Sequence, residues 1–141
     1  MIVFPIINTV IFVLLALLHV YWALGGKWWL KNAIPKTKDT LDVAVFHPGV
    51  FITLVVAAGL LGFGALHFYT LQDAFHFMDA FLPWGIGGIA LIFALRAIGD
   101  FKYVGLFKRV YNSDFAIYDT RYYIPLCVFI SINAVFTYFT I

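Results

Sequence analysis

IVFPIINTVIFVLLALLHVYWAL, residues 2–24, carries no Asp, Glu, Lys or Arg side chain. A helix needs about 20 consecutive apolar residues to cross the hydrocarbon core of a bilayer. The run is therefore long enough for one membrane span. Because it lacks a basic leading segment and a small-residue cleavage site, we expect a retained helix and not a signal peptide.

Three further apolar runs follow the first one. They cover residues 49–68, 82–101 and 122–141. Hydrophobic residues make up 64% of the 141-residue chain and charged residues 11%, whereas soluble domains have about 45–50% and about 25%. A soluble fold of this size would leave much apolar surface in water. The sequence therefore predicts an all-α integral membrane bundle of four transmembrane helices, in a single domain over residues 1–141.

The distribution of basic residues predicts the orientation of the four spans. Segment 69–81 has no Lys or Arg, whereas segments 25–48 and 102–121 have four each. Loops rich in Lys and Arg stay in the cytoplasm. We therefore expect both basic loops to be cytoplasmic and both termini to lie on the outer side of the membrane. The net charge of +2 is too small to indicate a nucleic-acid partner.

The loop between the third and fourth spans has its own helical pattern. Apolar and aromatic residues recur at helical spacing within residues 102–111, and basic residues interrupt them. This pattern is typical of a short amphipathic helix at a membrane interface. Such a helix would lie on the inner membrane surface or pack on the inner end of the bundle.

Arg96 and Asp100 interrupt the inner end of the third apolar run. Residues four apart share a face of a helix, so the two side chains would form a local ion pair, with Arg96 extending to the inner membrane surface. Intramembrane charges are also candidates for functional sites. The alternative is a polar pocket to which every span contributes.

The residues that would form this pocket lie near the inner ends of the predicted spans. Arginine pairs would hold a phosphate or a carboxylate, and a neighbouring carboxylate, Asp100 or Asp119, would tune His19 for proton exchange. The candidate ligand-binding residues are His19, Tyr21, Trp22, His47, Arg96, Asp100, Asp119 and Arg121.

Metal and cofactor sites have weaker support in the sequence. His67, His76 and Asp79 are of the types that ligate zinc, but no HExxH or similar motif contains them. Bis-histidine haem would need two facing histidines, and only His19 and His47 lie near one level. Nucleotide-binding, serine-hydrolase and CxxC motifs are absent from the sequence. We therefore predict no cofactor.

Three classes of function fit these features. The first is binding or transport of a small anion or a lipid headgroup at the cytoplasmic side. The second is an accessory or structural subunit of a larger membrane complex. The third is a lipid-modifying enzyme that uses His and Asp in acid–base catalysis. The sequence favours a non-enzymatic role. Its expected partners are membrane lipid and either further copies of the chain or a larger membrane complex.

Four sequence blocks carry a resemblance to a known family. They are HVYWALGG (19–26), HPG (47–49), RAIGDFKYVGLFKR (96–109) and FAIYDTRYYIPLC (115–127). With these blocks the chain resembles a family of small bacterial four-span membrane proteins without an assigned function. The resemblance implies a multi-pass protein of the bacterial inner membrane. It implies no activity.

Overall fold

The computed structural model describes residues 2–35, 48–72 and 78–141, and these residues form helices and no strands. The all-α prediction is thus confirmed for this part of the chain. His47 and His76 lie outside it. The elements are α1 (Val3–Ala23), α2 (Leu30–Ala33), α3 (Val50–Tyr69), α4 (Leu82–Ile98), α5 (Asp114–Tyr118), the π-helical turn η1 (Asp119–Tyr123) and α6 (Ile124–Tyr138).

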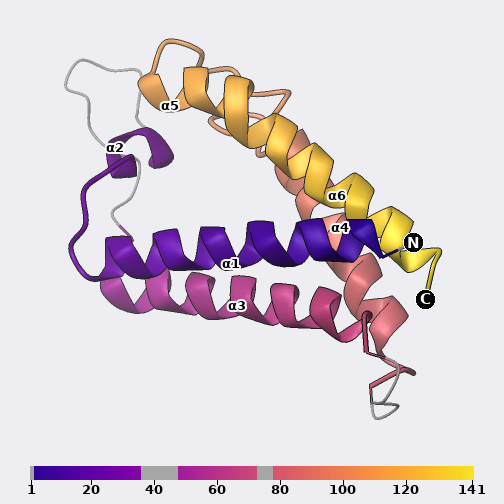
Figure 1. Cartoon of the computed structure of the whole chain (residues 1–141). Coiled ribbons are helices and arrows are strands. Elements are labelled where there is room, and N and C mark those ends of the chain that lie inside the picture. The colour runs from indigo at the N-terminus through magenta and orange to yellow at the C-terminus, as the bar shows by residue number, and fades with distance from the viewer. Residues whose placement is uncertain (1, 36–47, 73–77) are drawn as a thin grey trace.

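The long helices form two antiparallel pairs (Figure 1). Helix α1 lies beside α3, and α4 lies against α6. The two pairs meet near the chain termini and diverge toward the opposite end of the molecule, where α2 lies between α1 and α5. We call this diverging end the open end. It corresponds to the end that the sequence predicts to be cytoplasmic.

The hydrophobic core lies where the two pairs meet. Phe12 of α1 is fully buried there, together with Ile86 of α4 and Ile130 of α6. The ring of Phe93, on α4, lies 5.4 Å from the ring of Phe12 and 6.3 Å from the ring of Phe63 on α3. Phe93 therefore marks the level at which the two pairs are still in contact.

Two helices in the described part of the chain have the length and composition to cross a membrane. Helix α1 has 21 residues and α3 has 20, and both are strongly apolar. Helix α4 is apolar but has only 17 residues. Elements α5, η1 and α6 follow one another without a break, so helical backbone extends from residue 114 to residue 138. Four spans and the location of the termini stay predictions.

The loop after α4 differs from the prediction in two ways. Helix α4 ends at Ile98, so the third apolar run stops being helical before residue 101. Residues 102–111 contain bends and turns but no helix, so the prediction of an amphipathic helix there is wrong. In a helix, the N–H groups of residues 102, 103 and 104 would donate to backbone carbonyl groups. Here all three donate to Oδ1 of Asp100 instead.

A polar cluster lies inside the core, where three helices meet. Asn8 of α1 donates from Nδ2 to His67 Nε2 of α3 at 3.0 Å and to the Ile130 carbonyl of α6 at 3.1 Å. Asn133 Nδ2 donates to Asn8 Oδ1 at 3.4 Å. His67 Nδ1 lies 3.0 Å from the Phe63 carbonyl and donates to it, because Nε2 acts as the acceptor. The cluster thus joins α1, α3 and α6.

Candidate functional site

Asp119 is the centre of a buried charge cluster at the open end. It is 0% exposed. Its Oδ1 accepts a hydrogen bond from Arg96 Nη2 at 2.9 Å, and its Oδ2 accepts from Lys108 Nζ at 3.1 Å and from the Gly105 N–H at 2.8 Å. One carboxylate therefore holds together the end of α4, the loop after it and η1.

The π-helical turn positions Asp119 in this cluster. The N–H group of Ile124 donates to the carbonyl of Asp119, five residues earlier. Pro125 has no N–H group, so the carbonyl of Arg121 lacks its ordinary α-helical donor. Such wide turns are frequent at functional sites.

Lys108 is buried inside the loop although a basic loop residue is expected to face water. It is 2% exposed. Its Nζ donates to the Gly105 carbonyl at 3.2 Å and to Thr120 Oγ1 at 2.7 Å, in addition to Asp119. All three ammonium hydrogens thus have acceptors. Sequence reasoning missed this residue, because nothing in GLFKR tells which of Lys108 and Arg109 turns inward.

Two glycines let the loop fold back on itself. Gly99 and Gly105 have φ values of +91° and +90°, in the left-handed region that favours glycine. Their backbones touch: a Cβ atom on Gly99 would collide with the Val104 carbonyl, and one on Gly105 would collide with Gly99. The loop therefore requires both glycines, and its compact form brings Gly105 and Lys108 to Asp119.

Asp100 stabilises this loop and does not pair with Arg96. The predicted Arg96–Asp100 ion pair is wrong, because α4 ends at Ile98 and Asp100 leaves the helix face. Its three N–H donors lie at 2.7–2.9 Å. Partial burial raises the pKa of Asp100, but the hydrogen bonds from these N–H groups outweigh it and leave the pKa below its ordinary value of 3.8.

We expect Asp100→Ala to lower the free energy of unfolding by about 1 kcal/mol, as loss of a helix cap does. Since the folded pKa is lowered, the ionised carboxylate stabilises the fold fully above its unfolded pKa, and this contribution is lost as the pH falls through the folded pKa. Reversible unfolding in detergent would then show that, as the pH falls, the free energy of unfolding of the wild type approaches that of Asp100→Asn. A pH-independent difference between the two would contradict this role.

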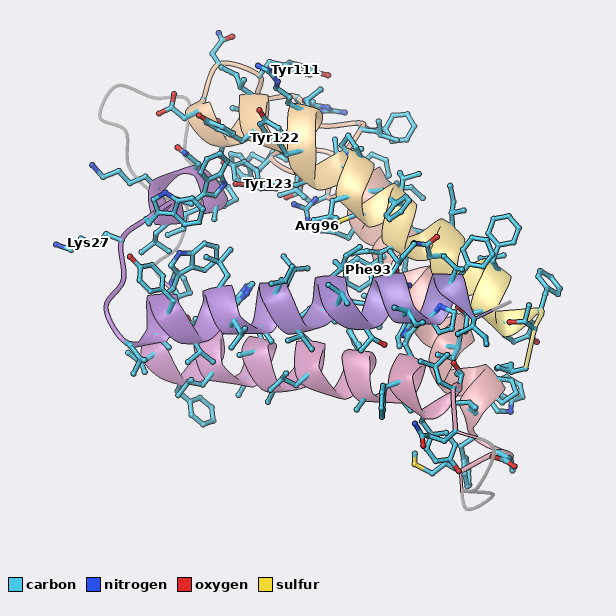
Figure 2. The ribbon with its side chains drawn as sticks, in the orientation of Figure 1. Lys27, Phe93, Arg96, Tyr111, Tyr122 and Tyr123 are labelled. Carbon is cyan, nitrogen blue, oxygen red and sulfur yellow. The ribbon has the colours of Figure 1, made fainter. Side chains whose placement is uncertain are left out.

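One nitrogen of the Arg96 guanidinium group has no hydrogen-bond partner among the described residues. The Arg96 side chain is 33% exposed and Nη2 binds Asp119. The unpartnered nitrogen is Nη1, which is buried. Figure 2 shows Arg96 in the region between the two helix pairs, with Phe93 one turn earlier on α4. The cluster thus presents one unpaired cationic donor at the open end.

An aromatic contact joins the segment after α1 to η1. Trp29 Nε1 donates to the Tyr123 hydroxyl at 2.7 Å, and this hydroxyl donates to the Asn32 carbonyl at 3.0 Å. The Trp29 ring also meets the Tyr118 ring edge-on at 4.9 Å. Trp29 has a φ of 63°, which is unusual for a bulky residue. These contacts join the segment around α2 to α5 and η1 at the open end.

His19 and Trp22 lie in a different place from the charge cluster. They line an apolar cavity of about 290 Å³ between α1, α2 and α3, with Ile52 and Val56 on the far wall. His19 Nδ1 lies 2.7 Å from the Leu15 carbonyl. The predicted tuning of His19 by Asp100 or Asp119 finds no support, because both carboxylates bind other groups.

The remaining predicted site residues are dispersed. Tyr21 is exposed and lies against Gly26. Arg121 is exposed, with its guanidinium carbon 5.5 Å from the centre of the Tyr122 ring. Among the described members of the predicted set, the structure therefore pairs Arg96 with Asp119 in the charge cluster and His19 with Trp22 at the separate cavity. The role of these residues in ligand binding stays a prediction.

The two weak metal candidates that the structure describes, His67 and Asp79, bind other groups of the protein. Both ring nitrogens of His67 are hydrogen-bonded inside the core, and Asp79 Oδ1 accepts from the Tyr69 hydroxyl at 3.4 Å. No group of three metal-ligating side chains occurs within residues 2–35, 48–72 and 78–141.

In the described residues, fold and site define a small all-helical protein with two helices long and apolar enough to cross a membrane. A buried charge cluster joins α4, the loop after it and η1. Residues 12–134 match the model of the family described as "Protein of unknown function (DUF3995)". The chain belongs to this family. No curated protein and no solved structure matches it.

Proposed function

We propose that the protein is a four-span membrane protein whose basic loops face the cytoplasm. The spans are α1, α3, α4 and the helical stretch from residue 114 to residue 138. Large apolar side chains on all four are exposed, and they include Leu14, Leu61, Leu95 and Phe129. A lipid environment would remove this surface from water. Helix α4 spans about 26 Å at 1.5 Å per residue, so the bilayer is locally thin there or the following loop also enters it.

At the inner end of these spans, the protein binds an anionic group at Arg96. The observation that carries this proposal is the buried Nη1 atom of Arg96, which has no partner within the described residues. A buried donor without an acceptor costs about 1–3 kcal/mol. An anion with two oxygens would satisfy it, because guanidinium groups bind phosphate and carboxylate through parallel hydrogen bonds.

The charge of the cluster supports an anionic ligand. Asp119 carries one negative charge, whereas Arg96 and Lys108 carry two positive charges. Lys108 has all its hydrogens engaged, so Arg96 is the cation of this cluster that keeps a donor for a ligand. The ligand would be the phosphate of a lipid headgroup or a free small anion. Both have the same chemistry at the guanidinium group.

The position of Arg96 favours a ligand between the two helix pairs. Phe93 still touches both α1 and α3 through its ring contacts, and Arg96 lies one helical turn nearer the open end. A headgroup would therefore reach Arg96 from the inner membrane surface. Binding at this position, rather than catalysis, agrees with the absence of an ionisable partner for His19 among the described residues.

We test the site by native mass spectrometry of protein released from detergent, with added phosphatidylglycerol or inorganic phosphate. Arg96→Gln keeps an amide donor for Asp119 but removes the charge. Because hydrogen bonds to charged groups contribute about 1.5–3 kcal/mol, we expect binding to be weaker by roughly 10- to 150-fold. Arg121→Gln is the matched control, since it removes an exposed cation near the same end, and it should retain the ligand.

The two probes distinguish the sources of the anion. Retention of phosphatidylglycerol alone would identify a lipid headgroup, and retention of phosphate would identify a free anion. Equal losses in Arg96→Gln and Arg121→Gln would show nonspecific attraction to basic loops. That result, or the absence of both adducts from the wild type, would contradict the proposed site.

A further inference from the structure

The loop between α4 and α5 displays three large apolar side chains away from the protein. Phe101, Leu106 and Phe107 are 58%, 56% and 59% exposed. The rings of Phe101 and Phe107 stack on each other with their centres 5.9 Å apart. We call these three side chains the apolar tip. It lies at the open end, in the loop that leads from α4 to α5 (Figure 1).

The loop is built to hold this tip in place. Asp100 accepts three N–H groups on one side, and Asp119 holds the Gly105 N–H and the Lys108 ammonium group on the other. The Leu106 N–H donates to the Ala97 carbonyl at 2.9 Å. Phe101 has a φ of 62°, which non-glycine residues rarely adopt. The Gly105 N–H group and the Lys108 ammonium group therefore bond inward, whereas the side chains of the apolar tip face outward.

Two cations lie beside the apolar tip. Lys102 directly follows Phe101, and Arg109 follows Lys108; both are exposed. The N–H group of Arg109 donates to the Lys102 carbonyl at 3.0 Å, so the backbones that carry the two cations lie side by side. Lys102 Nζ also lies 5.0 Å from the centre of the Tyr103 ring. The loop thus combines an apolar surface with a basic margin.

We propose that this loop inserts its apolar tip into the cytoplasmic leaflet, with Lys102 and Arg109 at the phosphates of anionic lipids. The inference rests on the proposed four-span topology. Helix α4 ends at Ile98, three residues before Phe101, so the tip continues directly from a span. Apolar side chains flanked by Lys and Arg are typical of surfaces that bind anionic membranes. This position also compensates for the short length of α4.

The test measures the depth of a spin label in phosphatidylglycerol vesicles. The label is attached to Leu106→Cys in a Cys127→Ser background and compared with Asn112→Cys, an exposed site in the same loop. Frequent collisions of the label with oxygen indicate exposure to lipid, and frequent collisions with a water-soluble nickel chelate indicate exposure to water. We expect the ratio of oxygen to nickel collisions to be severalfold higher at position 106 than at position 112. Lys102→Gln with Arg109→Gln should lower the ratio at position 106.

A label at Leu95→Cys, on the exposed face of α4, separates the two proposals. Lipid exposure at position 95 with water exposure at position 106 would overturn the insertion of the loop and leave the topology intact. Water exposure at both positions would overturn both. A label at position 106 that neither reagent reaches would show a protein contact, which also overturns the inference. An unchanged ratio in the charge-removing variant would overturn the role of Lys102 and Arg109.

Discussion

Asp119→Ala is expected to lower the free energy of unfolding by about 3–5 kcal/mol, because removing one partner of a buried ion pair leaves the other charge uncompensated. The uncompensated charge is that of Lys108, which is 2% exposed. The Gly105 N–H would also lose its acceptor. The loop after α4 would then lose its attachment to η1. Reversible unfolding in detergent micelles, followed by circular dichroism, measures the effect.

A double variant shows whether the buried charge causes this loss. Lys108→Met removes the ammonium group but keeps a long apolar chain, so Asp119→Ala with Lys108→Met should be more stable than Asp119→Ala alone. Arg121→Ala is a control for loss of a surface cation and should change stability by less than about 0.5 kcal/mol. A double variant that is less stable than either single variant would show that Lys108 acts through packing and not through its charge.

Much of this fold could be predicted because apolar length and composition are local properties. The predicted runs 2–24 and 49–68 agree with α1 and α3 to within one residue at each end. The inner end of the third run was misplaced for an equally local reason. Phe101 is apolar like the helix before it, but the left-handed Gly99, packed on Gly105, and the N–H groups that Asp100 accepts end α4 at Ile98.

The candidate site could be predicted only in part. The charge of Arg96 and Asp119 and their position near the inner ends of the predicted spans made each of them a candidate. The sequence spacing, however, predicted an ion pair of Arg96 with Asp100, which is four residues away. The actual partner is 23 residues away in sequence. Likewise, the Trp29–Tyr123 hydrogen bond joins residues that are 94 positions apart. Such contacts depend on how the two helix pairs diverge, and no periodicity within one segment contains that information.

The core cluster of Asn8 was missed for a different reason. A single asparagine in an apolar helix has no local pattern that indicates a partner, and His67 was considered only as a weak metal ligand. In the structure each of them satisfies the other. Together with Asn133 they form a polar contact between α1, α3 and α6. This contact lies where the two helix pairs meet, whereas the Asp119 cluster lies at the open end.

We expect Asn8→Leu to lower the free energy of unfolding by about 2 kcal/mol. Individual hydrogen bonds between membrane helices contribute only about 0.6 kcal/mol on average. The substitution, however, removes the partner of His67 Nε2 and of the Asn133 amide at once, and each unsatisfied buried group costs about 1–3 kcal/mol before relaxation. Unfolding in detergent micelles measures the loss. Thr9→Val is the matched control, because Thr9 is the next residue and its hydroxyl binds only backbone carbonyls.

The double variant Asn8→Leu with His67→Leu decides between hydrogen bonding and packing. Replacing both partners of a buried hydrogen bond by apolar groups of similar shape is often nearly neutral. We therefore expect the double variant to be more stable than Asn8→Leu alone, although His67 is fully buried. If the double variant lost the sum of both single effects, the cluster would act by its shape. If Asn8→Leu matched Thr9→Val, the three helices would be held together by their apolar contacts alone, chiefly those of Phe12 and Ile130.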